Sequence, residues 1–266
     1  MPNPLNPSTL PTRYEIRQLD SSHIPWAAIM FIHSNFFHSP ICSVLYPAGV
    51  TARVHAASSV GTYLVTHQII WGHSYGVFDT KYVFQRAESA SVGGALYWDA
   101  SERKGTGCWL DGLPARQLAL SYDSIHPLDM AKLVPLIETV PYFATMYYVL
   151  EELDSREKAA WEAKGIGEVL FRSATFTRHD YEGKLLMAGL ARWLMREAEL
   201  KGFRTIQIEC AHDTVTHVWS HPDKARRPYW GTIVSQIKPK PEIENEYERE
   251  MDGEMVVVKE VSKPSG

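Results

Sequence analysis

The residues best suited to chemistry lie in the stretch from Glu168 to Trp219. An apolar, strand-like run there ends in a short polar turn that contains Gly183, and an amphipathic helix follows at once, then Gly202 and a second apolar run, TIQIEC. Strand, turn, helix and strand predict a βαβ unit. The turn places free backbone N–H groups at a helix N-terminus, where phosphate oxygens can accept hydrogen bonds and the helix dipole favours negative charge. The pattern therefore predicts a site for a phosphate-bearing ligand.

The helix after the turn has one apolar face. Apolar side chains recur every three or four positions, at Leu186, Leu190, Trp193, Leu194 and Ala198. This is the spacing of an amphipathic helix with one face suited to burial. Gly183 stands at the head of the helix, and because it has no Cβ, the backbone there can approach a ligand closely.

Composition limits the classes of function. The chain has 266 residues, of which 45% are hydrophobic and 22% charged, as is usual for globular proteins. Its formal net charge of -4 gives no basic surface, which argues against nucleic acid as the main partner. The 3 cysteines lie far apart and predict no disulfide framework, so a reducing compartment fits best. The first residues have no signal-peptide pattern, and the apolar stretch 24–37 is too short to span a membrane. We expect a cytoplasmic protein without a membrane partner.

The rest of the chain is organised around the βαβ unit. Residues 1–12 are rich in Pro, Asn and Ser and predict a flexible N-terminal arm, and we expect residues 13–266 to form a single domain. Alternating apolar residues predict short strands at 14–19, 76–82, 94–98, 229–237 and 255–261, the second and third being joined by a polar turn. Helices are expected at 26–37 and within 128–163, the latter belonging to a helical insertion at about 103–164.

The turn also carries a family resemblance. The run TRHDYEGKLLM, residues 177–187, resembles the acetyl-coenzyme A signature that the GNAT N-acetyltransferase superfamily places between its fourth strand and third helix. TIQIEC takes the place of the family's fifth strand, residues 212–219 resemble the helix that follows, and VTHVWSHPDKARRPYWG is similar to uncharacterised fungal members. The resemblance implies the α/β GNAT fold, in which helices flank a mixed, mostly antiparallel central sheet, here with a helical insertion before the βαβ unit.

That resemblance implies an enzyme that moves an acetyl group from acetyl-coenzyme A to a primary amine of a small molecule, with no metal. It assigns cofactor binding to Phe176, Thr177, Arg178, Glu182, Gly183, Lys184, Leu185, Leu186, Met187 and Trp219. Three of these depart from the family's pattern. Glu182 replaces a basic or amide residue, and Leu185 and Met187 replace small ones, so coenzyme A is expected to bind weakly or in an altered pose. Arg178 and Lys184 could supply the missing positive charge.

Three residues are candidate general bases that take a proton from the attacking amine. Glu168 opens the presumed fourth strand, near the carboxylate base of the family's protein-lysine acetylating members. Glu209 and His212 end the presumed fifth strand, which faces the acyl group in this fold. The alternative for each is an ordinary strand-end or buried, hydrogen-bonded polar residue. Trp219 falls where many members have a tyrosine that protonates the leaving thiolate, a reaction that an indole cannot perform.

Further candidates have two interpretations each. The aromatic residues Tyr75, Phe78, Tyr97 and Trp98 could line a substrate cleft, or pack in a core. His217 and His221 are four residues apart and near His212, but no cysteine or carboxylate completes a metal motif, so we expect no metal. Two rivals to the transferase remain open. One is an acyl-coenzyme A-binding regulatory protein without transferase activity, and the other is a GNAT-fold enzyme of secondary metabolism with different chemistry.

Overall fold

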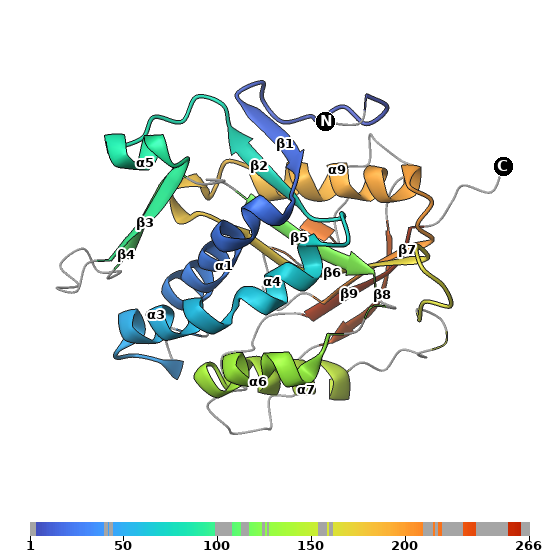
Figure 1. The fold of residues 1–266 in the computed structure, drawn as a ribbon. Helices are drawn as coiled ribbons and strands as arrows, with labels where there is room; N and C mark the ends of the chain where they lie inside the picture. The colour runs from blue at the N-terminus through green and yellow to red at the C-terminus, as the bar shows by residue number, and fades with distance from the viewer. Residues whose placement is uncertain are drawn as a thin grey trace.

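Seven strands form one sheet in the computed structural model, which describes residues 4–39, 42, 45–98, 108–112, 117–123, 126, 128–153, 159, 162–209, 215, 218–219, 231–237 and 255–261. In sheet order the strands are β1 (Tyr14–Gln18), β2 (Tyr75–Asp79), β5 (Gln117–Asp123), β6 (Val169–Thr177), β7 (Thr205–Glu209), β9 (Met255–Val261) and β8 (Gly231–Ile237). Neighbours in this order are antiparallel except β6 and β7, which are parallel (Figure 1). The chain is therefore a mixed α/β protein.

The βαβ unit predicted from the sequence is confirmed. Helix α9 (Leu186–Leu200) joins β6 to the parallel strand β7. All five residues of its predicted apolar face are at most 2% exposed. Burial of each large apolar side chain contributes about 2 kcal/mol, and together they fix the helix against the sheet. After the helix the chain turns at Gly202, where φ is +85°, a value that glycine adopts without strain.

Helices cover both faces of the sheet (Figure 1). Helix α9 contributes to a core with β2, β6 and β7 on one face. On the other face, α1 (Ile24–His38), α3 (Val50–Val60) and α4 (Thr62–Ile69) share a second core with α6 (Met130–Thr139) and α7 (Tyr142–Leu153). Two separate cores on opposite faces mean that a residue's place along a strand decides which core it joins.

The segment between β2 and β6 differs from the sequence prediction. Strands β3 (Gly94–Trp98) and β4 (Cys108–Gly112) form their own two-stranded sheet beside the short helix α5 (Ala87–Ser91), so β2 and β3 are not joined as a pair. Helices α6 and α7 do lie between β5 and β6, but the range 103–164 also holds β4 and β5. Because β5 is a middle strand of the large sheet, that range is not one inserted helical block.

Residues 4–12, for which we expected a flexible arm, lie along the outer side of α9. The Asn6 side chain is only 1% exposed, and its Nδ2 donates to the Trp193 carbonyl (3.0 Å) and to Glu197 Oε2 (3.1 Å). Trp193 Nε1 donates in turn to the Asn6 carbonyl (2.8 Å). A Cβ on Gly189 would overlap Leu10, so this glycine lets the segment approach the helix closely. The hydrogen bonds of Asn6 account for the docking.

The apolar helix expected at 26–37 is α1. Asp20 accepts a hydrogen bond from the Ser22 backbone N–H (2.9 Å) and caps a short 3-10 turn, Ser21–His23, that leads into it. In the described part of the chain, no helix has both the length and the apolar character needed to cross a membrane.

Candidate functional site

The sheet opens between β6 and β7. Their parallel pairing runs from Val169 opposite Thr205 to Arg172 opposite Ile208. Beyond that point β6 continues to Thr177 and is paired, among the described residues, with β5 alone. In the part of the chain that the structure describes, the backbone groups of residues 173–177 that face away from β5 have no strand partner.

A β-bulge lies where this pairing ends. Leu120 of β5 is opposite Ala174, whereas Tyr122 is opposite Phe171, so β6 has one extra residue at Arg172 and Ser173. A bulge bends its strand and increases the local twist, which turns the second half of β6 away from β7. It also exchanges the two faces. Leu170 joins the α9 core, but Phe176, six residues later, joins the α1 core.

The turn after β6 leads to the N-terminus of α9, which has no side-chain cap among the described residues. The chain passes through Arg178 and a 3-10 turn, His179–Tyr181, before α9 begins at Leu186. No side chain of the described residues caps α9. Gly183 has φ +72°, and Leu185 has φ +58°, a left-handed conformation that no other described non-glycine residue adopts. Such a conformation costs a residue with a Cβ about 1–2 kcal/mol. The strain falls where the resemblance expects a small residue.

Arg178 is bound within the turn. Its guanidinium is 8% exposed and makes two hydrogen bonds to the Asp180 carboxylate, from Nε (2.6 Å) and from Nη2 (2.5 Å), while Nη1 donates to the Gly112 carbonyl (3.0 Å). Burial opposes ionisation, but the hydrogen bonds and the charge of Asp180 outweigh it and raise the pKa of Arg178. Its charge is matched internally, so Arg178 holds the turn to β4 and does not supply an uncompensated cation.

Lys184 is an exposed cation of the turn. Its Nζ donates to the Asp180 carbonyl (2.9 Å) and lies 4.1 Å above the Tyr181 ring. Glu182 is also exposed, and its Oε2 lies 3.2 Å from His179 Nδ1. With Arg178 balanced by Asp180 and Lys184 by Glu182, the turn is neutral while His179 is neutral. Attraction for an anion therefore depends on the free N–H groups of α9.

A histidine pair joins the turn to α1. The imidazoles of His38 and His179 stack with centroids 4.4 Å apart and planes at 1°. Burial, and then the charge of His179, lower the pKa of His38. Nothing in the local sequence pairs these residues, since they are brought together only by the tertiary fold. Among the residues that the structure describes, no three His, Cys, Asp or Glu side chains are grouped to hold a metal ion.

The candidate bases lie at two ends of the unit. Glu168 precedes β6, and its Oε2 accepts a hydrogen bond from the Lys164 N–H (2.8 Å). It is five residues before Ser173, about 16 Å along a strand. The Glu209 backbone ends β7 opposite Val257, but its side chain and all of His212 lie outside the described residues.

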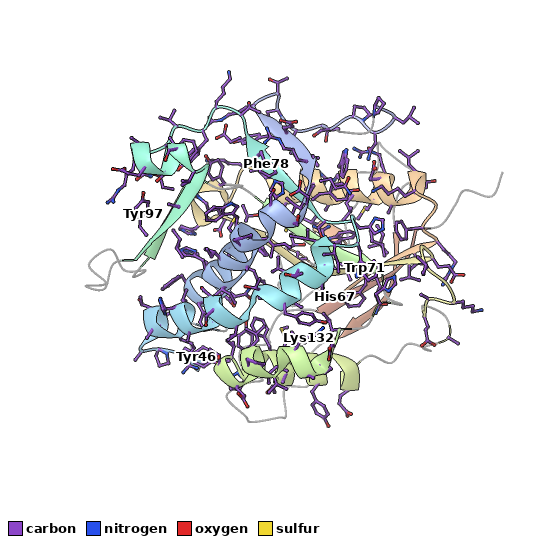
Figure 2. All side chains as sticks on the ribbon, viewed as in Figure 1. Tyr46, His67, Trp71, Phe78, Tyr97 and Lys132 are labelled. Atoms are coloured by element: carbon purple, nitrogen blue, oxygen red, sulfur yellow. The ribbon has the colours of Figure 1, made fainter. Side chains whose placement is uncertain are left out.

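The three aromatic candidates whose side chains are described, Tyr75, Phe78 and Tyr97, lie in different parts of the fold and do not line one cleft, and for Tyr75 and Phe78 the core-packing alternative applies. Tyr75 is 4% exposed, packs edge-on against Trp193, and accepts a hydrogen bond from Lys201 Nζ in the α9 core. Burial raises its pKa. Phe78 joins the α1 core, because residues three apart in a strand point to opposite faces. Tyr97 belongs to the separate β3–β4 sheet, well away from Phe78 in Figure 2. The Trp98 side chain lies outside the described residues.

Sequence reasoning missed the residues at the bulge. Arg172 is 1% exposed, and its guanidinium lies 4.7 Å from the ring of Trp219, which is itself 1% exposed in the α9 core. Gln68 of α4 is completely buried and donates from Nε2 to Ser173 Oγ. An arginine inside an otherwise apolar strand was the available signal for Arg172, whereas no local pattern marks Gln68.

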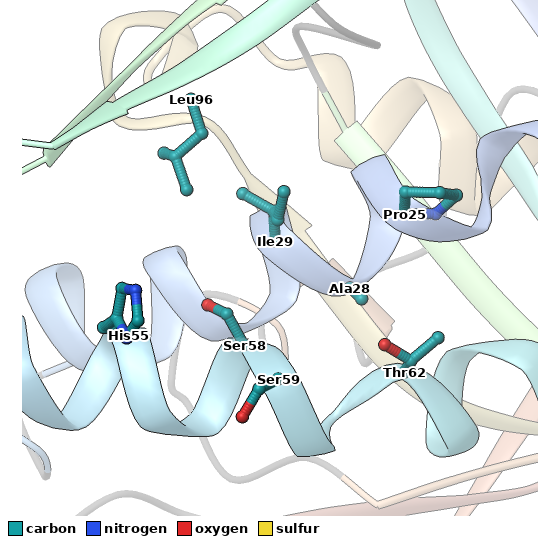
Figure 3. A pocket seen from close by; sticks show the side chains of 8 residues that line it. All are labelled: Pro25, Ala28, Ile29, His55, Ser58, Ser59, Thr62 and Leu96. Carbon is teal, nitrogen blue, oxygen red and sulfur yellow. The ribbon is translucent and has the colours of Figure 1, made fainter.

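A shallow hollow lies elsewhere, between α1 and the α3–α4 helices (Figure 3). Its volume is about 320 Å³, and its lining includes Pro25, Ile29, His55, Ser58 and Leu96. None of its lining residues belongs to β6 or to the turn before α9. We therefore place the candidate site at the opening of the sheet, where backbone groups of β6 have no strand partner among the described residues, and not at this hollow.

Comparison with known proteins identifies the fold. No family model matches the sequence, and no curated protein matches it. Among solved structures, the C-terminal condensation domain of Ebony, in complex with beta-alanyl-dopamine, superposes with a TM-score of 0.57 at 12% identity, covering 92% of this chain and 97% of that one. Arylalkylamine N-acetyltransferase 2 from Aedes aegypti superposes with a TM-score of 0.52 at 11% identity, covering 94% and 100%. The chain has the GNAT fold. At these identities the likeness concerns the fold alone.

Proposed function

We propose that the chain transfers an acetyl group from acetyl-coenzyme A to a primary amine of a small molecule. One observation carries the proposal. Among the described residues, the parallel pairing of β6 with β7 ends just before Ser173, and α9, which follows the turn after β6, begins without a side-chain cap. The first feature would hold a thioester and the second a phosphate.

The residues present fit acetyl-coenzyme A as a substrate. The first N–H groups of α9, beside Gly183, would bind the pyrophosphate, with Lys184 as the nearby cation. The free edge of residues 173–177 would bind the amide groups of the pantetheine arm in the manner of an added strand. Backbone N–H groups of the same edge would polarise the thioester carbonyl as negative charge develops on its oxygen.

The reaction requires the amine to lose a proton as its nitrogen attacks the carbonyl carbon and the carbon–sulfur bond breaks. Glu209 and His212 are our preferred bases, because Glu209 ends β7 and His212 comes three residues later in the sequence. Glu168 ranks lower, since its carboxylate already accepts a hydrogen bond from Lys164 and lies about 16 Å from the bulge. Trp219 is buried and has no acidic proton for the thiolate.

The names of the structural neighbours suggest which amines to test first. One neighbour is an arylalkylamine acetyltransferase, and the other binds a compound in which a β-alanyl group is joined to dopamine. Both names refer to an arylalkylamine, in the first case as its N-acylated form. We propose arylalkylamines as the first acceptor class to test. We also propose that the protein acts in a reducing cytoplasm, as expected from the sequence.

A second candidate function is acyl-coenzyme A binding without transfer. The observation that favours it is Leu185, which is 77% exposed at the head of α9 and comes three residues after Glu182, whose side chain is also exposed. The side chains of Leu185 and Glu182 both lie just before the first turn of α9, where we propose that the diphosphate binds. A protein that binds the ligand in an altered pose would sense acyl-coenzyme A without presenting its thioester to an amine.

Calorimetry followed by an activity assay separates these functions. Acetyl-coenzyme A should release or absorb heat on binding and raise the thermal midpoint, because it binds the folded state only. Thiol release is then measured with a panel of arylalkylamines and aliphatic diamines. Release with any amine supports the transferase, whereas binding without release across the panel supports the second candidate. The absence of both heat and thermal shift at millimolar ligand would contradict both.

A further inference from the structure

A buried amide meets the strand at the point where the sheet opens. Gln68 lies on α4, is completely buried, and donates a hydrogen bond from Nε2 to Ser173 Oγ. The two residues are 105 positions apart in the sequence. Ser173 is the first residue of β6 beyond its last pair with β7, and it belongs to the bulge. The contact therefore joins the helix layer to the opening itself.

Core packing alone does not explain this amide. Gln68 Oε1 is buried and has no hydrogen-bond partner among the described residues. An unsatisfied buried acceptor destabilises the folded state, and a methionine or leucine would fill a similar volume without that cost. The Gln68 amide is better explained by its effect on Ser173, whose hydroxyl it contacts at the edge of the candidate site.

The hydrogen bond fixes how Ser173 can act. A serine hydroxyl has one proton to donate and two lone pairs to accept with. Because the Gln68 N–H donates to Ser173 Oγ, that oxygen is the acceptor in this contact, and the Ser173 proton remains available. Unlike Gln68, Ser173 is only partly buried. The available proton thus belongs to a group at the opening.

We propose that the Ser173 hydroxyl donates a hydrogen bond to the sulfur of coenzyme A, and that Gln68 is the positioning residue that orients it. This inference rests on the proposed function. As the amine nitrogen forms its bond to the carbonyl carbon, the carbon–sulfur bond breaks and its electron pair goes to sulfur. The hydrogen bond stabilises that thiolate, which then takes from solvent a proton equivalent to the one that the amine lost. Ser173 thereby stabilises the leaving thiolate, and no acid is needed at the position of Trp219.

The test titrates the thiol of bound coenzyme A and requires no acceptor amine. A hydrogen bond to a charged group favours the charged form, so the thiol bound to the wild-type protein should ionise at lower pH than in Ser173→Ala. We expect the two thiol pKa values to differ by about one unit. The ultraviolet absorbance of the thiolate measures the titration. Ser173→Thr keeps a hydroxyl and should retain most of the wild-type value.

Two further variants complete the experiment. Gln68→Met should move the thiol pKa in the same direction as Ser173→Ala but less, with coenzyme A still bound. Ser58→Ala is the matched control, since its hydroxyl donates to the Val54 carbonyl on α3 (2.7 Å), and it should leave the value unchanged. Equal thiol pKa values in wild type and Ser173→Ala, with coenzyme A bound to both, would overturn the inference. Failure of the wild type to bind coenzyme A at all would instead overturn the proposed function.

Discussion

The two halves of β6 differ in their strand pairing. Residues 169–172 are paired with β7, Leu170 and Phe171 among them also with β5, and Leu170 is 1% exposed in the α9 core. Residues 174–177 pair, in the described part of the chain, with β5 alone. The bulge at Arg172 and Ser173 divides the halves. A bulge bends its strand, and the described pairing of β6 with β7 ends where this bulge begins.

The largest expected effect is on catalysis in the open half. With a responsive amine in hand, replacing the working base should lower turnover by about 10²–10⁴-fold with little change in coenzyme A affinity. We would measure Glu209→Gln and His212→Ala, with Glu168→Gln as the matched carboxylate at the closed end of β6. If Glu168→Gln alone lost activity, the comparison between the two halves would be reversed.

A substitution in the paired half of β6, residues 169–172, should instead change the free energy of unfolding. Leu170→Ala removes a buried side chain from the α9 core and should lower the free energy of unfolding by about 2–5 kcal/mol. Chemical denaturation measures this loss. Coenzyme A affinity, determined below the unfolding transition, should stay near the wild-type value. A variant that kept its stability but lost affinity would show that the paired half belongs to the binding site.

Gly183 offers a comparison within the βαβ unit. Gly183→Val should weaken coenzyme A binding at least about tenfold, because a branched side chain would obstruct hydrogen bonds to charged oxygens. Gly202→Val is the control, since Gly202 also has a positive φ and open space around it but lies at the other end of α9. Both should lose similar stability through backbone strain. Equal affinities for the two variants by calorimetry would place the anion site elsewhere.

A smaller effect is expected at Leu185. Leu185→Gly relieves the left-handed conformation at φ +58° and should raise the free energy of unfolding by about 1 kcal/mol. It also removes an exposed side chain from the head of α9, so coenzyme A should bind more tightly. Denaturation and calorimetry test the two parts separately. Weaker binding would mean that the Leu185 side chain contacts the ligand favourably.

The smallest effect is on pH dependence. The pKa of His38 is lowered in the folded protein by burial and by His179, so the unfolded chain binds more protons near pH 6. Stability should therefore fall as the pH drops below about 6.5, and the slope should be shallower in His38→Phe. Denaturation at several pH values measures both slopes. An unchanged slope in the variant would mean that other groups carry the dependence.

The βαβ unit could be predicted because its signals are local. The apolar spacing of α9 and the glycines at its two ends are visible in one short stretch, and the structure confirms them. The GNAT fold followed from the resemblance of the turn. The bulge could not be predicted, because it is defined by the register of β6 against β5, some fifty residues earlier.

Three further features were not predicted. Tyr75 and Phe78 looked like one aromatic group, yet their spacing of three places them on opposite faces of the sheet. Gln68 carries no local sign of its contact with Ser173, which depends on how α4 packs on β6. Docking of residues 4–12 likewise depends on Asn6 reaching α9. Long-range packing decides the last two, whereas the alternation of side chains along a strand, a local property, decides the first.

Amide hydrogen exchange with and without acetyl-coenzyme A tests the central claim most directly. Binding at the opening should slow exchange in residues 173–177 and at the start of α9, where free N–H groups gain acceptors, and leave residues 169–172 unchanged because they are already paired. Protection confined to those two segments is the result that our account predicts. Protection elsewhere, such as around the hollow lined by Ile29 and His55, with no change in residues 173–177, would contradict it.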